Sequence, residues 1–286
     1  MRISVVITGM NHENTIMEAT ESVLSQSRLP DEFGMVIGPS YDQTREFVDF
    51  YRDELDFAYF PEAVDPAEYG HGKLRLEVIN RLDGDYVLFL PAHSVLYPDA
   101  LQSLEQAIGE VETSPDLVFA SFRILNTGEK EPYRWSLSAP GYQNLLSGGP
   151  IHPAMVLYRL NNLRSKSATL ETLGAGPFTT LAWILQSLRD HDARAEFIDQ
   201  AIGESWDEVE SSYCWTRSTQ RGMDEIKRVL TDMIPESISI IETWESRGPQ
   251  RPDPGQRNQI VSGKEKDSAV GQPSSSWIDA GVPFVE

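Results

Sequence analysis

Short β-rich segments alternate with helical patterns throughout residues 1–110, and this alternation limits the possible folds more than any other feature of the sequence. Nearly continuous runs of β-branched and aromatic residues predict buried strands at 3–8, 33–37, 57–60 and 86–90. Apolar residues at helical spacing predict helices at 15–26, 44–51, 73–82 and 98–108. Because this order is typical of βαβ units, we expect an α/β fold with a mostly parallel central sheet and helices on both faces.

Ligands of such sheets usually bind beyond the carboxyl ends of the strands. The segments to consider in this chain are 8–13, 37–42, 69–75 and 91–97. We therefore expect a small-molecule site to be built from these segments.

The second half of the chain is less regular. Strands are predicted at 117–124, 154–159 and 195–198, and helices at 179–188 and 224–234. From residue 246 the sequence is rich in Pro, Gly, Ser and Gln, which predicts an extended tail at 246–286. The tail ends in W-I-D-A-G-V-P-F-V-E, and we expect this segment to dock on its own chain, on a second copy or on another protein.

The chain carries 44 acidic and 24 basic residues, for a formal net charge of −20. A protein binds nucleic acids and anionic membranes through a positively charged surface, so neither is expected as a partner of this acidic chain. The single cysteine excludes an internal disulfide. No secretory leader is visible, and no apolar stretch reaches the roughly 18–20 residues that a spanning helix needs. We therefore expect a cytoplasmic protein without a membrane span.

Four segments with recognisable motifs follow one another along the chain. They read S-V-V-I-T-G-M-N-H-E-N, M-V-I-G-P-S-Y-D-Q-T, L-R-L-E-V-I-N-R-L-D-G-D-Y-V-L-F-L and P-A-H-S-V-L-Y-P-D-A-L. In this order and spacing they resemble the motifs of family 2 glycosyltransferases, closely over residues 1–110 and more weakly to residue 204. The resemblance implies the GT-A fold, which is Rossmann-like.

Members of this family transfer a sugar from a nucleotide-diphosphate sugar to a hydroxyl group. The resemblance therefore implies a nucleotide sugar as the small-molecule partner, and a carbohydrate or another hydroxyl compound as the acceptor. It divides the GT-A-like domain into a nucleotide-sugar-binding half at 1–110 and an acceptor-side half at 111–245, followed by the tail.

The resemblance also implies which residues contact the donor: Thr8, Gly9, Asn11, Pro39, Asp42, Arg75, Ala92 and His93. Arg75 falls on the arginine of the family's A-R-N motif, and with His71 and Lys73 it could form a small basic pocket for a diphosphate. Structural alternatives stay open: Asn11 as a turn residue, Asp42 as a helix cap, and Arg75 as a routine cation on a partly exposed helix.

The metal motif of the family departs most clearly from its usual form. Pro91, Ala92 and His93 stand where the family has Asp-x-Asp, and a hard cation such as Mg²⁺ or Mn²⁺ needs those carboxylate oxygens. His93 could hold a softer metal, donate to a phosphate, or be an ordinary loop histidine. The need for a divalent metal therefore stays open.

Two further acidic motifs are also lost. Ile37 and Gly38 replace the paired aspartates after the second strand, one of which helps to read the nucleotide base in the family. The acidic pair that supplies the usual catalytic base falls near Phe178 and Thr179. The remaining candidates for the base are His152, Glu171, Asp190 and His191. We favour His152 because it lies in the Gly/Pro-rich loop G-G-P-I-H-P before a predicted strand.

The resulting expectation is a glycosyltransferase of the hexosyltransferase type, whose need for the usual metal stays open. The alternative is a catalytically inactive GT-A-like protein that serves in binding or scaffolding, since three separate acidic motifs are lost together. A nucleotidyltransferase-like protein is a weaker third reading, because no Gly-rich phosphate loop with a following lysine is present.

Overall fold

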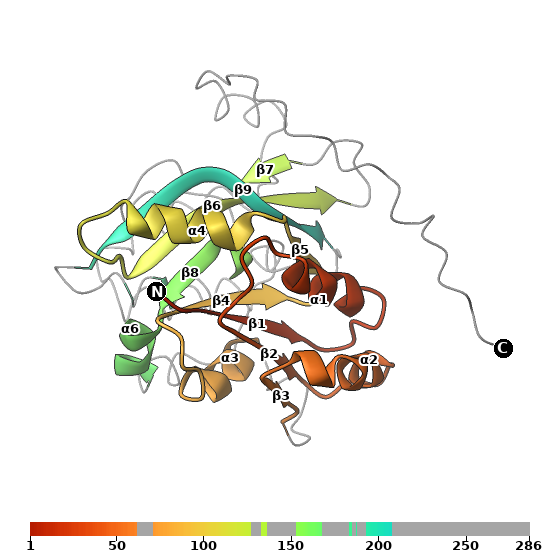
Figure 1. Ribbon diagram of the computed structural model, residues 1–286. Coiled ribbons are helices and arrows are strands. Elements are labelled where there is room, and N and C mark those ends of the chain that lie inside the picture. The colour runs from red at the N-terminus through yellow and green to blue at the C-terminus, as the bar shows by residue number, and fades with distance from the viewer. Residues whose placement is uncertain are drawn as a thin grey trace, which may run out of the picture. The chain divides into compact units, whose positions relative to one another are not determined.

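The computed structural model describes residues 1–61, 71–126, 133–135, 153–167, 183–184, 187 and 193–207 (Figure 1). All of them lie within one compact unit, Met1–Pro249. The predicted helix at 224–234 and the predicted tail at 246–286 lie outside the described residues.

The described strands form one mixed sheet in the order β3-β2-β1-β4-β8-β6-β9-β5, with β7 paired to β6 (Figure 1). Their bounds are β1 Ile3–Gly9, β2 Glu32–Ile37, β3 Phe57–Tyr59, β4 Tyr86–Pro91, β5 Ser94–Leu96, β6 Leu117–Asn126, β7 Tyr133–Trp135, β8 Val156–Arg159 and β9 Ala195–Asp207. Strands β1 to β4 pair only in parallel with one another, and β6 pairs in parallel with β9. The predicted α/β class with its mostly parallel sheet is confirmed.

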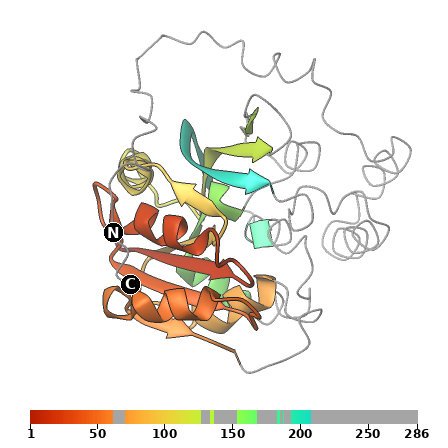
Figure 2. The same ribbon diagram turned by 90° about the vertical axis from the view of Figure 1, so that its right-hand side faces the viewer.

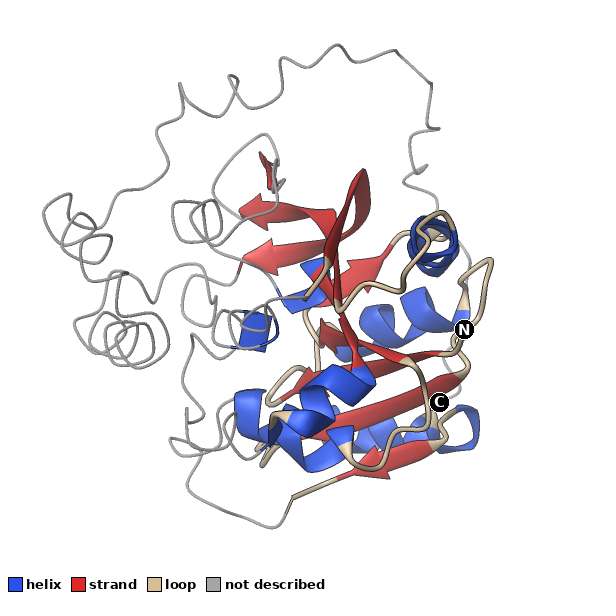
Figure 3. Ribbon diagram, turned by 90° about the vertical axis from the view of Figure 1, so that its left-hand side faces the viewer, coloured by secondary structure: helices blue, strands red, loops and turns tan. Residues whose placement is uncertain are grey.

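Helices connect these strands and pack on both faces of the sheet. They are α1 Ile16–Leu24, α2 Thr44–Phe50, α3 His71–Ile79, α4 Ala100–Gly109 and α6 Leu160–Ser165, with single 3₁₀ turns at Arg52–Glu54 and Pro153–Met155. Figures 2 and 3 view the sheet from opposite sides, and helices stand in front of strands in both. The apolar stripe of α4, formed by Leu101, Leu104 and Ile108, is buried as the helical spacing predicts.

Strands β1 and β4 form the centre of the core and are buried along their whole lengths. Both faces of these strands are covered, which explains why their sequences are continuous apolar runs and do not alternate with polar residues. No helix in the described part of the chain is long and apolar enough to cross a membrane.

The other half of the sheet is antiparallel at several places. Strand β8 runs antiparallel to both β4 and β6, and β5 runs antiparallel to β9. Strand β9 continues to Asp207, well past the predicted end at residue 198. Gly203 permits this extension, because a Cβ atom there would lie 2.3 Å from the carbonyl oxygen of Val95 in β5.

Candidate active site

The carboxyl ends of β1, β2 and β4 lie side by side at one edge of the sheet. Gly9 of β1 is in register with Ile37 of β2, and Thr8 is in register with Pro91 of β4. The loops that follow these three strands therefore leave the sheet together, which is where open parallel sheets usually bind ligands.

The loop after β1 is joined to the loop after β2 by a set of short hydrogen bonds. The backbone N–H of Gly38 donates to the carbonyl oxygen of Gly9 at 2.9 Å, and that of Asn11 donates to Ser40 Oγ at 3.1 Å. In return, Asn11 Oδ1 accepts the backbone N–H of Tyr41 at 2.8 Å. Asn11 has a φ of 58°, the left-handed conformation that Asn tolerates better than most residues. Asn11 thus both turns its own loop and fixes the neighbouring one.

Asp42 makes the second connection between these loops. Its carboxylate accepts the backbone N–H of Thr44 at 3.0 Å, the Thr44 hydroxyl at 2.5 Å and the backbone N–H of Glu13 at 3.0 Å. Burial alone would raise the pKa of Asp42, but these hydrogen bonds outweigh it and lower the pKa below the ordinary value. Thr44 Oγ1 also accepts the backbone N–H of His12 at 2.7 Å. Asp42 therefore holds the start of α2 against the β1 loop.

Gly9 and Ala92 are small because the β1 and β4 loops approach closely. A Cβ atom on Gly9 would lie 2.6 Å from the Cβ of Ala92 and 2.8 Å from Cδ2 of His12. The backbone N–H of Ala92 donates to the carbonyl oxygen of Thr8 at 2.9 Å. The structure therefore brings three of the predicted donor residues, Thr8, Gly9 and Ala92, into direct proximity.

The side chains that stand in the metal-motif positions, Pro91, Ala92 and His93, are all buried. His93 is only 3% exposed, and its ring lies 5.2 Å from that of His12, centroid to centroid, at a tilt of 34°. Burial, together with the nearby His12, lowers the pKa of His93 to about 3. The imidazole of His93 is therefore neutral at physiological pH.

These residues do not fit Mg²⁺ or Mn²⁺. A hard cation takes several oxygen ligands, whereas the segment after β4 offers one imidazole and no carboxylate. Within the described ranges, no group of three or more histidine, cysteine or acidic side chains is placed to hold a metal ion.

Arg75 is completely buried in α3 and does not form an exposed basic surface. Its guanidinium carbon lies 5.4 Å from the ring centroid of Phe89 in β4. The Phe89 ring in turn contacts Tyr158 and Trp183, at centroid distances of 6.3 and 5.7 Å. Arg75 thus lies beside an aromatic cluster in the core, and a diphosphate could reach it only if the surrounding side chains moved.

The other predicted residues are distributed differently. Pro39 is partly exposed in the loop after β2. His152, Glu171, Asp190 and His191 lie outside the described residues, as do the side chains of His71 and Lys73.

Sequence reasoning missed two residues at this edge of the sheet. His12 packs against His93, and the side chain of Tyr41 is 84% exposed, more than any other large apolar side chain in the described ranges. Tyr41 stands in the variable position of the turn G-P-S-Y-D-Q-T, where no helical or strand period applies. Its aromatic character in a polar turn was the only signal available.

Comparisons with known proteins agree with this fold. The structure of Staphylococcus aureus TarS 1–349 has a TM-score of 0.62 at 17% identity, covering 86% of this chain and 71% of that one. The same protein in complex with UDP-GlcNAc gives 0.62 at 18% identity, with 86% and 72% covered. Mycobacterium tuberculosis glucosyl-3-phosphoglycerate synthase, in complex with Mn²⁺, UDP and glucosyl-3-phosphoglycerate, gives 0.50 at 16% identity, with 84% and 80% covered.

At these identities the similarity establishes the GT-A fold and nothing more specific. No curated protein matches the sequence. The family model of glycosyl transferase family 2 matches residues 4–167, which is more than half of the chain. The protein therefore belongs to glycosyl transferase family 2.

Proposed function

We propose that this protein transfers a sugar from a nucleotide-diphosphate sugar to an acceptor hydroxyl without a bound divalent metal. The observation that carries the proposal is the hydrogen-bonded pair of loops after β1 and β2, centred on Asn11 and Asp42. Such a framework holds a ligand surface rigid at the sheet edge where this fold binds its donors.

The donor would lie against the half of the domain formed by residues 1–110. Gly9, Asn11 and Pro39 are placed in these loops and are proposed to line the nucleotide position, with Thr8 and Asp42 holding the loops in shape. Because the similar TarS structure contains UDP-GlcNAc, a uridine nucleotide sugar is the first donor to test.

Without a metal, the charge that develops on the leaving diphosphate must be stabilised by fixed protein groups. We propose that Arg75 stabilises the charge on the diphosphate from a distance, because a buried positive charge is screened by solvent less than an exposed one. We assign His93 a packing role under the loop, since it is neutral and buried against His12.

The acceptor would bind to the half formed by residues 111–245. His152 is proposed to take the proton of the acceptor hydroxyl as it attacks the sugar. A protein or a second copy of the chain is proposed to contact residues 246–286.

Turnover assays in the presence and absence of metal test this function. Purified protein is mixed with a panel of nucleotide sugars, and nucleotide release and sugar transfer are followed with added Mn²⁺ or with EDTA. We expect turnover to be equal within about twofold in both conditions, and His152→Ala to lower kcat at least about 100-fold. His191→Ala is the matched control and should leave kcat unchanged.

Turnover that requires Mn²⁺ would contradict the metal-independent mechanism. If His191→Ala lost turnover while His152→Ala kept full activity, the general base would be His191 and not His152.

A second candidate function is favoured by the burial of Pro91, Ala92 and His93. A loop that presents none of these side chains to a ligand suits a protein that binds a nucleotide sugar and does not transfer it. Donor binding without release of nucleotide across the panel would support this function, and any measured transfer would exclude it.

A further inference from the structure

The exposed side chain of Tyr41, in the loop after β2, has no role in the family's motifs. The residue is 84% exposed, although the end of β2 before it is buried and Pro39 and Ser40 are partly buried. An isolated exposed aromatic side chain is common on protein surfaces and needs further support before it indicates a binding site.

The first support is that the backbone of Tyr41 is fixed. Its N–H donates to Asn11 Oδ1 at 2.8 Å, and Asn11 adopts a positive φ to present that oxygen. Ser40 Oγ accepts the N–H of Asn11 and donates to the carbonyl oxygen of Gly38 at 3.1 Å. With the backbone fixed, only the two side-chain torsions of Tyr41 remain to be ordered when a flat ligand stacks on its ring.

The second support is the apolar character of the neighbouring surface. A Cβ atom on Gly38 would lie 3.5 Å from both Cβ and Sδ of Met10, so the Met10 side chain packs over the Gly38 backbone. Ile37 and Gly38 bring no carboxylate, and the carboxylate of Asp42 is already bound to Thr44 and Glu13. Ile37 and Gly38 are themselves buried, so the partly exposed Met10 supplies the apolar surface at the end of β2 and Tyr41 supplies the aromatic face.

We propose that Tyr41 stacks on the nucleobase of the donor, and that this protein binds the base by its face without reading the edge of the base through a carboxylate. The inference rests on the proposed function, because it requires a nucleotide donor at this edge of the sheet. Every nucleobase has a π-face, so stacking tolerates different bases. Uridine and adenine nucleotides should therefore bind with affinities within about tenfold of each other.

Calorimetric titration of the full chain with UDP and ADP tests this inference. Replacing a stacking aromatic by alanine costs about 1–3 kcal/mol per base, so Tyr41→Ala should weaken both affinities at least about fivefold. Tyr41→Leu, which keeps apolar bulk and loses the π-face, should weaken them similarly, whereas Tyr41→Phe should stay within about twofold of the wild type.

Phe50→Ala is the matched control. Phe50 is 77% exposed on the neighbouring helix α2, but it lies at the end of that helix away from Thr44 and the strand-end loops. Its removal should leave both affinities unchanged. Thermal unfolding of each variant verifies that the fold is intact.

The possible results separate the stacking role from the proposed function. If the wild type binds UDP or ADP and Tyr41→Ala binds them equally well, the stacking role is wrong and the donor site stands. If Tyr41→Ala weakens only UDP, or Phe50→Ala weakens binding as much, recognition through the face of the base at Tyr41 is also wrong. If the wild type binds neither these nor CDP and GDP, the proposed function fails together with the inference.

Discussion

At the two ends of the parallel strands, acidic residues bind different parts of the chain. At the amino ends, aspartates cap the first backbone N–H groups: Asp31 accepts from Ile3 at 2.8 Å, and Asp56 accepts from Phe33 at 2.7 Å. At the carboxyl ends, the positions directly after β2 and β4 hold no acid and Gly9 packs closely on Ala92, while the carboxylates of Asp42 and Glu13 accept N–H groups of the loops.

This difference shows that the missing acids of the candidate site do not reflect a shortage of acids. With 44 acidic residues in the chain, carboxylates are abundant, and they are used where they stabilise the starts of strands. At the amino ends, carboxylates therefore accept hydrogen bonds from the strands themselves, whereas at the carboxyl ends the strands are closely packed around the neutral, buried His93 and the Asp42 carboxylate binds only the loops. The two ends should respond differently to pH and to substitution.

The largest expected effect is the response of the carboxyl end to acid. The pKa of His93 is lowered from 6.5 to about 3, so between these values the unfolded chain binds a proton that the folded chain does not. The free energy of unfolding should therefore fall as the pH falls, by about 1.4 kcal/mol per pH unit and about 2 kcal/mol by pH 5. Urea denaturation at pH 7, 6 and 5 measures this slope, which His93→Gln should flatten by the same amount.

Asp31→Asn is the control at the amino end. Burial opposes ionisation of Asp31, but hydrogen bonds from the Ile3 N–H and from Arg28 lower its pKa below 3.8. Its contribution is therefore complete above the ordinary pKa and is lost only at lower pH. Asp31→Asn should keep the wild-type slope above pH 5. Equal slopes for wild type and His93→Gln would show that His93 is not a neutral buried group.

Gly9→Ala should have the next largest effect. The new methyl group would lie 2.6 Å from the Cβ of Ala92, and neither backbone can yield without moving a strand end. Overpacking of this kind costs about 1–3 kcal/mol, and displacement of the loop should also weaken nucleotide binding. Chemical denaturation and calorimetry measure the two effects.

Gly109→Ala provides the comparison, because a Cβ atom at the end of α4 would meet nothing within 4 Å. This substitution should be neutral or stabilise the fold by up to about 1 kcal/mol. If Gly9→Ala were as harmless as Gly109→Ala, the carboxyl ends of the strands would not be closely packed.

The parallel half of the fold could be predicted because its strands are buried on both faces. Continuous apolar runs such as Tyr86–Pro91 are a local signal that needs no knowledge of their neighbours. Strands β5 and β7 have three residues each and, unlike the equally short β3, do not lie in a continuous run of apolar residues. The second half of β9 could not be predicted either, because its pairing with β5 depends on Gly203 and Val95, which are far apart in the sequence.

The sequence predicted which loops would lie together at the strand ends, but not which of their side chains would be exposed. The motif order indicated the strand-end loops, yet a motif does not tell whether a side chain faces solvent. Arg75 is fully buried and lies on Phe89, whose ring contacts Tyr158 and Trp183 from two further parts of the chain. Tyr41 is exposed in a loop whose backbone is fixed by Asn11, which lies 30 residues away in the sequence.

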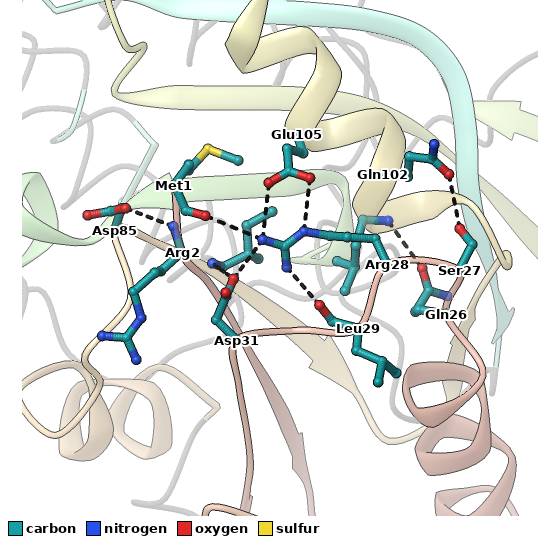
Figure 4. Close-up of polar contacts among 12 residues, drawn as sticks. Met1, Arg2, Gln26, Ser27, Arg28, Leu29, Asp31, Asp85, Gln102 and Glu105 are labelled. Atoms are coloured by element: carbon teal, nitrogen blue, oxygen red, sulfur yellow. Dashed lines mark hydrogen bonds and ion pairs between the residues drawn. The ribbon is translucent and has the colours of Figure 1, made fainter.

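The smallest expected effect concerns the charged network at the amino end. Arg28 donates to both carboxylate oxygens of Glu105 in α4, at 3.1 and 3.2 Å, and to Asp31 at 2.6 Å (Figure 4). It thereby joins the segment before β2 to α4. The Arg28 side chain is 17% exposed, so the pairs are partly screened, and Arg28→Ala should cost about 1 kcal/mol of unfolding free energy.

Salt and a matched exposed pair test whether Arg28 acts through charge. The loss in Arg28→Ala should shrink in 1 M NaCl, because the ion pairs of the wild type are then screened. Arg52, whose pair with Asp49 is about half exposed on both sides, is the control, and Arg52→Ala should cost no more than a few tenths of a kcal/mol. A loss in Arg28→Ala that is unchanged by salt would mean that the arginine stabilises the amino end through packing. The contribution of Arg28 to the amino end would then come from packing and not from its ion pairs.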